Sequence, residues 1–116
     1  MEKIFYLKTS IEKILNDNKA IDVKSICLKD KSTIADYMII ASGTSSRHLQ
    51  ALAEMTIEKF KKEEIHNCHL EGKNSSEWKL IDGIDIIVHI FNDKKRKFYD
   101  LEKMWSELIP KERLMI

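Results

Sequence analysis

Apolar side chains recur at helical spacing in three stretches of the chain. The first stretch predicts a helix from Ile4 to about Asn16, because its apolar residues fall on one side at intervals of three and four. The third predicts a helix over roughly Lys94 to Leu108, which ends before a proline. The second predicts a helix that runs from the turn at 43–46 to about Glu64 and buries Leu49, Leu52, Ala53, Thr56 and Phe60.

Between these helices, short runs rich in β-branched residues predict strands. They lie at 21–28, 37–42, 67–70, 77–81 and 85–91. The run at 37–42 is apolar on both sides, which is typical of a central strand, and the run at 85–91 is a second central candidate. The first two strands are expected to pair as a hairpin. The order α-β-β-α-β-β-β-α predicts an α/β (α+β) fold, with helices covering a mixed five-stranded sheet.

Composition narrows the class of protein. The 116 residues, 43% of them hydrophobic, predict one domain at 1–109 with a C-terminal tail at 110–116. Lysine and arginine number 20 against 19 acids, so the net charge of +1 excludes a protein that holds a phosphate backbone by charge alone. The longest apolar run, at 38–41, is too short to cross a membrane, and the N-terminus does not resemble a signal peptide. We therefore expect a cytoplasmic protein without a membrane partner.

The turn before the second helix carries the residues that most resemble an enzyme site. Ser45, Ser46 and His48 suggest a nucleophile, but the Gly-x-Ser-x-Gly pattern is missing, and capping of the helix explains the hydroxyls. A helix N-terminus beside Arg47 can also bind phosphate, so a nucleotide-binding enzyme that uses 43–48 is the alternative function. The strand–turn–helix order suggests a nucleotidyltransferase scaffold, yet the Asp-x-Asp pair that would hold its metal ions is absent. We therefore expect no catalytic residue.

Metal ligands and basic residues occur only in small groups. His66, Cys68 and His69 have the spacing of half a zinc site, but no second ligand pair follows, so neither a metal nor another cofactor is expected. The basic run at 94–97 is interpreted as the solvated start of a helix. A minor contact to ribonucleic acid is the alternative interpretation of that run.

Two aromatic residues stand among polar neighbours. Trp78 follows the polar stretch 74–77 and is predicted to begin a strand at an exposed edge of the sheet. Tyr99 lies beside Asp100 and Glu102. Because an aromatic side chain next to acidic residues suits a surface that binds a basic protein, both are docking candidates.

Four separated motifs point to one family. They are DYMIIASGTSSRH at 36–48, EGKNSSEW at 71–78, LIDGIDIIVH at 80–89 and YDLEKMW at 99–105. In this order and spacing, they resemble the ribosome silencing factors, also called the Iojap family, over about residues 21–105.

The resemblance implies a translation repressor. Members bind the large ribosomal subunit through large-subunit ribosomal protein number fourteen, sterically block joining of the small subunit, and repress translation under nutrient limitation. Their fold is nucleotidyltransferase-like without the catalytic carboxylates, and some members form homodimers, which leaves a homodimer open here. The implied partner-binding residues are Trp78, Leu80, Asp82, Tyr99, Asp100, Leu101 and Glu102, with a secondary contact at Arg47, His48, Lys94, Lys95 and Arg96.

The chain departs from the family's pattern in two places. The family usually has Asp-x-Gly-Asp before the last strand, where this chain has Asp82-Gly83-Ile84-Asp85. We expect Gly83 to supply a positive φ, so the turn geometry is expected to differ from that of the family. The family often ends the middle helix with glycine, where this chain has Glu64-Ile65, so the usual left-handed cap is in question.

Overall fold

The computed structural model describes residues 2–29 and 35–93. The third predicted helix lies outside these residues, as do the candidates Tyr99, Asp100, Leu101, Glu102, Lys94, Lys95 and Arg96. The described elements are α1 (Glu2–Asp17), β1 (Ile21–Cys27), β2 (Tyr37–Gly43), α2 (Ser46–Lys62), β3 (His69–Glu71), β4 (Trp78–Asp82) and β5 (Ile86–Asn92). Their order along the chain agrees with the predicted order, and their limits differ from the prediction by a residue or two.

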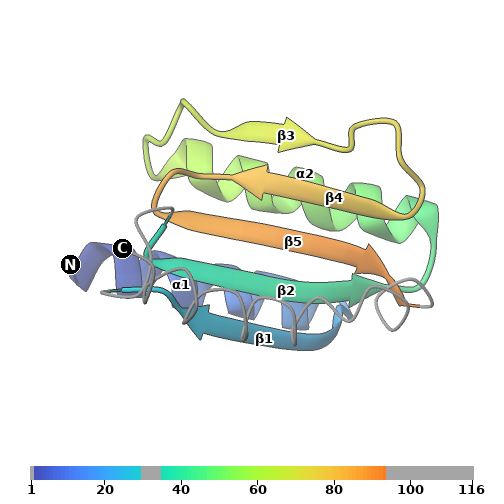
Figure 1. The fold of residues 1–116 in the computed structure, drawn as a ribbon, viewed down its shortest axis with the longest axis horizontal. Coiled ribbons are helices and arrows are strands. Elements are labelled where there is room, and N and C mark those ends of the chain that lie inside the picture. Colours follow the sequence, from blue (N-terminus) through green and yellow to red (C-terminus); the bar gives the residue numbers. More distant parts are fainter. Residues whose placement is uncertain (1, 30–34, 94–116) are drawn as a thin grey trace, which may run out of the picture.

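The strands form one mixed sheet in the order β1-β2-β5-β4-β3 (Figure 1). β2 and β5 run parallel, whereas the other neighbouring pairs are antiparallel. The predicted five-stranded mixed sheet is confirmed, as are the interior positions of β2 and β5 and the pairing of β1 with β2. The prediction that Trp78 begins an edge strand is wrong, because β3 pairs along β4 and takes the edge of the sheet. The sequence predicts a strand at 67–70 but does not show which strand it pairs with, and that pairing decides which strand lies at the edge.

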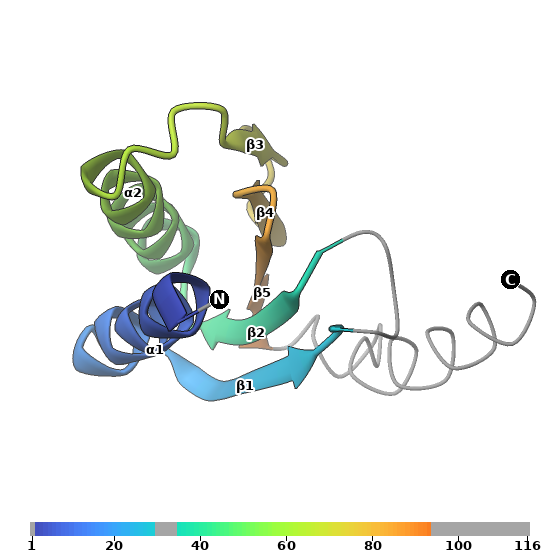
Figure 2. The ribbon, with the colours of Figure 1, turned by 90° about the vertical axis from the view of Figure 1, so that its left-hand side faces the viewer.

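Both described helices cover the same face of the sheet, which we call the inner face (Figure 2). The predicted buried side of α2 is confirmed, since all of its members lie in the interior. Each buried leucine or isoleucine side chain stabilises the fold by roughly 1.5–3 kcal/mol. The core between the helices and the inner face includes Leu7, Ile11, Leu15, Ile39, Ala41, Leu49, Leu52, Ala53, Phe60, Ile81, Ile86, Val88 and Ile90.

Local hydrogen bonds cap α2 at both ends. The Ser45 hydroxyl accepts a hydrogen bond from the His48 amide at 3.1 Å, which confirms the capping role predicted for this turn. At the other end, Glu64 adopts a left-handed conformation with a φ of 65°, and the Ile65 amide donates to the Phe60 carbonyl at 2.8 Å. This is the Schellman arrangement that glycine usually completes. The cap therefore keeps its left-handed geometry with glutamate in the glycine position.

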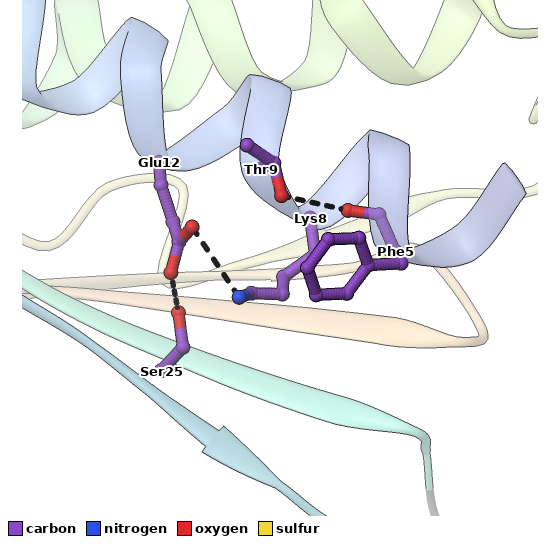
Figure 3. A network of polar contacts seen from close by, with 5 residues as sticks. All are labelled: Phe5, Lys8, Thr9, Glu12 and Ser25. Carbon is purple, nitrogen blue, oxygen red and sulfur yellow. Dashed lines mark hydrogen bonds and ion pairs between the residues drawn. The ribbon is translucent and has the colours of Figure 1, made fainter. Parts of the chain in front are cut away.

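A polar network joins α1 to the edge strand β1 (Figure 3). The Lys8 ammonium pairs with the Glu12 carboxylate at 3.4 Å, and Glu12 also accepts a hydrogen bond from the Ser25 hydroxyl of β1. The same ammonium lies 4.9 Å from the ring centre of Phe5 and 5.5 Å from that of Tyr37. These contacts orient α1 on the sheet in addition to the apolar core.

The opposite face of the sheet, which we call the outer face, is apolar on its central strands. Met38 and Ile40 of β2 are fully buried, and Ile87 of β5 is nearly so. Side chains alternate between the two faces of a strand, so these residues point away from α1 and α2. Toward β4 and β3, the outer-face side chains become partly or fully exposed.

Candidate functional site

The exposed part of the outer face lies on β4 and β3. Trp78, Leu80 and Asp82 alternate onto this face and are each partly exposed. In the register of the sheet, Leu80 lies opposite Glu71 of β3 and Asp82 lies opposite His69, both of which are exposed. We call these five residues the β3–β4 surface. It combines an apolar centre with acidic neighbours, so it offers contacts to a partner that carries basic groups.

Strand pairing thus brings together the three described candidates Trp78, Leu80 and Asp82 and adds Glu71, which the sequence analysis did not single out. A three-residue strand gives no alternation from which its outward side could be read. Only the pairing with β4 shows that the Glu71 carboxylate shares a face with Leu80.

Trp78 is held closely by its surroundings. A Cβ atom on Gly72 would lie 2.8 Å from one carbon of the indole and 2.9 Å from another, so the ring rests against this glycine. Gly72 also has a φ of 74°, which glycine adopts without strain. On the β5 side, the ring of His89 meets the indole edge-on, with ring centres 6.1 Å apart and an interplanar angle of 79°.

His89 is a second residue that the sequence analysis missed as part of this surface. It lies opposite Leu80, and its ring centre is 4.5 Å from that of Phe91. Its Nδ1 atom is buried and has no hydrogen-bond partner within residues 2–29 and 35–93. Burial lowers the pKa of the imidazole from 6.5 to about 4, so His89 is neutral at physiological pH.

The turn between β4 and β5 differs from its prediction. Gly83 has no positive φ; instead Ile84 adopts the left-handed conformation, with a φ of 73°. Gly83 is required for space, since a Cβ atom there would lie 2.4 Å from the Phe60 ring. The Asp82 carboxylate accepts a hydrogen bond from the Ile84 amide at 2.9 Å and so stabilises this turn as well as facing outward.

The turn at 43–48 lies at the end of the sheet where β4 begins (Figure 1). His48 accepts a hydrogen bond at Nδ1 from the Thr44 amide at 3.0 Å, so the proton is on Nε2, which donates to the Asn18 carbonyl at 2.8 Å. Its ring nitrogens therefore join this turn to the end of α1. Arg47 is exposed and remains a candidate for a secondary contact.

Other candidate chemistry is sparse in the described part of the chain. There, no three side chains of histidine, cysteine, aspartate or glutamate come together as a metal site, and the group at 66–69 is no exception. A pocket of about 250 Å³ lies between α1 and α2, away from the β3–β4 surface. Within residues 2–29 and 35–93, no helix has the length and apolar character needed to cross a membrane.

Comparisons with known proteins agree with the motifs in the sequence. The model of the family described as "Ribosomal silencing factor during starvation" matches residues 3–114. Ribosomal silencing factor RsfS of Zymomonas mobilis is 43% identical over 92 residues, which are 79% of this chain and 69% of that protein. A mouse protein named "Mitochondrial assembly of ribosomal large subunit protein 1" is 29% identical over 96 residues, which are 80% of this chain and 42% of that protein.

Solved structures agree with the fold. The crystal structure of a Chromobacterium violaceum protein superposes with a TM-score of 0.82 at 30% identity, covering 89% of this chain and 86% of the other. Because the family model spans nearly the whole sequence and the sheet and helices match a solved relative, this chain belongs to the ribosomal silencing factor family.

Proposed function

We propose that this protein docks on the large ribosomal subunit and prevents the small subunit from joining it, which represses translation under nutrient limitation. The docking partner is large-subunit ribosomal protein number fourteen. The observation that carries the proposal is the β3–β4 surface, where the partly exposed Trp78 and Leu80 lie beside the carboxylates of Glu71 and Asp82. The name of the mouse relative, which refers to assembly of the large subunit, supports this choice of subunit.

The proposed mechanism is steric and needs no catalysis. A typical protein interface buries about 800 Å² on each partner, and a 13.6 kDa domain bound at the subunit interface then occupies space that the small subunit requires. Tyr99, Asp100, Leu101 and Glu102 extend the contact in this proposal, and the acids face basic groups of the partner. Lys94, Lys95 and Arg96 are candidates for a minor contact with ribosomal RNA. Arg47 and His48 are candidates for a secondary contact. The protein acts in the cytoplasm, as a monomer or a homodimer.

A subunit-joining assay tests the mechanism. Purified large and small subunits are mixed with and without saturating protein, and joined ribosomes are separated by sucrose-gradient sedimentation. We expect the protein to deplete joined ribosomes and to sediment with the large subunit. Joined ribosomes at their usual level under saturating protein would refute the proposal.

The Trp78→Ala variant tests the docking surface. Loss of a central aromatic anchor commonly costs about 2 kcal/mol or more, so we expect at least a tenfold loss of affinity for the large subunit. Tyr6→Ala is the matched control, because Tyr6 is a 57% exposed aromatic on α1, on the opposite side of the sheet. Affinity measured by co-sedimentation should fall in the first variant only. Equal affinities of Trp78→Ala and the unmodified protein would remove Trp78 from the docking surface.

A further inference from the structure

Lys79 is unusual in this sheet because a charged residue occupies a buried position. It lies on β4 between Trp78 and Leu80, is only 3% exposed, and points to the inner face, opposite Ile90 in the register. A buried ammonium is stable only where hydrogen bonds replace the water that it has lost. The acceptors that Lys79 uses therefore show what this residue does.

Both acceptors belong to the connection between β3 and β4, which we call the 72–77 loop. The Lys79 ammonium donates to the Gly72 carbonyl at 3.0 Å and to the Lys73 carbonyl at 2.6 Å. Hydrogen bonds with a charged donor are about twice as strong as neutral ones. One buried side chain thus ties down the start of the loop from the inner face.

The end of the loop is tied to its start by Ser75. The Ser75 amide donates to the Gly72 carbonyl at 3.0 Å, and the Ser75 hydroxyl accepts from the amides of Glu77 and Trp78 at 3.0 and 3.2 Å. The Gly72 carbonyl therefore receives two donors, one from Ser75 and one from Lys79. Through these bonds, the Lys79 ammonium and Ser75 both hold the backbone at Gly72.

Gly72 in turn is the residue on which the indole of Trp78 rests, at distances that leave no room even for a methyl group. A shift of Gly72 would either push the ring outward or open a gap beneath it. Preorganised side chains bind more tightly because less conformational freedom is lost on association.

We propose that Lys79 is a positioning residue of the docking surface, which holds the 72–77 loop closed from the inner face and so fixes the orientation of Trp78 on the outer face. The inference rests on the proposed function for its effect on affinity, but its effect on the indole is independent of any partner. Lys79 itself contacts no partner in this arrangement, since it is buried on the helix-covered side.

Lys79→Met is the variant that tests the inference, because methionine keeps much of the apolar stem and removes the donors. Full-length protein is labelled with 5-fluorotryptophan, and its ¹⁹F NMR signal for Trp78 is assigned with Trp78→Phe. We expect one narrow Trp78 signal in the unmodified protein and a broadened or divided signal in Lys79→Met. Lys73→Met is the matched control, because it makes the same change on an exposed side chain of the loop and leaves the carbonyl in place.

Affinity for purified large subunits provides the second measurement. We expect Lys79→Met to bind about fivefold more weakly or worse, an effect typical of residues coupled through direct contacts. In a Trp78→Ala background, the same change should cost no further affinity, because Lys79 acts through the indole. A merely structural role would instead give losses that add in full, and would leave the Trp78 signal of the folded variant narrow.

Each result has a distinct meaning. Unchanged affinity and an unchanged Trp78 signal in Lys79→Met overturn the inference, as does full additivity with Trp78→Ala. If Lys79→Met does not fold, Ser75→Ala replaces it as the test, because it removes the hydroxyl that holds the amides of Glu77 and Trp78 at the end of the 72–77 loop. Ser75→Ala must then show the same broadened Trp78 signal and the same lowered affinity. If unmodified protein does not bind the large subunit, the proposed function fails, while the ¹⁹F signal still decides whether Lys79 positions Trp78.

Discussion

At the scale of single residues, the β4–β5 turn meets two backbone requirements with only one glycine. Position 83 must be small because the Phe60 ring packs against it, and position 84 must adopt a positive φ. Gly83 satisfies the first requirement, whereas Ile84, a β-branched residue that is 51% exposed, is strained by the second. The left-handed conformation costs a residue other than glycine roughly 1–2 kcal/mol.

Ile84→Gly should therefore stabilise the protein. Relief of strain exceeds the roughly 0.5–1 kcal/mol that glycine loses through its greater freedom in the unfolded chain, so we expect a net gain of about 0.5–1 kcal/mol. The melting temperature should rise by about 2–5 °C in a thermal scan. Gly83→Ala is the control within the same turn, and it should lower stability by about 1–3 kcal/mol by overpacking against Phe60. A lower melting temperature for Ile84→Gly would contradict the strain.

His89 should make the stability of the protein depend on pH. Its pKa is about 4 in the folded protein and 6.5 in the unfolded chain, so between these values the unfolded chain binds more protons. The contribution of neutral His89 to the free energy of unfolding is thus fully present above pH 6.5 and falls as the pH drops toward 4. Below pH 4, this group changes the stability no further. Between pH 7 and pH 5, the contribution of His89 to the free energy of unfolding should fall by roughly 2 kcal/mol.

Urea denaturation at pH 7 and pH 5 measures this effect. His89→Phe keeps an aromatic ring and removes the titrating group, so its loss of stability between the two pH values should be smaller than that of the unmodified protein. His69→Gln, a change at an exposed histidine on β3, should retain the full loss. The same loss in His89→Phe as in the unmodified protein would show that His89 does not titrate as its burial requires.

At the scale of helices and strands, long elements with one buried side were predictable from the sequence. All five residues on the predicted buried side of α2 are buried. They were predictable because a helix of seventeen residues repeats its apolar spacing over several turns. The interior position of β2 was predictable for a different reason, since a strand that is apolar on both sides needs cover on both. Local chemistry also predicted the cap of α2, since a serine before a helix needs only its own neighbours to act.

Features that depend on pairing between distant strands were not predictable. The edge position predicted for Trp78 is wrong because the sequence predicts a strand at 67–70 but does not show that this strand pairs along β4. Glu71 joined the candidate surface only once its register with Leu80 was known. In the Asp82–Asp85 turn, the sequence showed a glycine but not the Phe60 ring that requires it, so the positive φ was assigned to the wrong residue.

At the scale of the whole molecule, a net charge of +1 does not show where the acidic and basic residues lie. Glu71 and Asp82 lie on the outer face, whereas Lys59, Lys61 and Lys62 cluster in the last turn of α2, in the helix layer. Rim charges act mainly on the rate and selectivity of association, and their effect depends on the sign of the facing partner. The location of a charge should therefore affect binding to the large subunit more than the net charge of the protein does.

Two charge reversals that change the total equally separate these possibilities. Glu71→Lys reverses a charge on the β3–β4 surface, and Glu58→Lys reverses one on α2, where the carboxylate is 70% exposed and only weakly paired with Lys62 at 3.9 Å. If net charge attracted the protein to ribosomal RNA, both variants would bind the large subunit more tightly. If the acidic surface meets a basic protein, Glu71→Lys should bind about tenfold more weakly, whereas Glu58→Lys should stay within about twofold of the unmodified protein.

Co-sedimentation with the large subunit at low and physiological salt measures the affinity of both variants. The difference in affinity between Glu71→Lys and Glu58→Lys should shrink as salt rises, because screening weakens the repulsion that Glu71→Lys introduces. Equal strengthening of both variants would instead make the ribosomal phosphates, and not a basic protein, the main electrostatic partner.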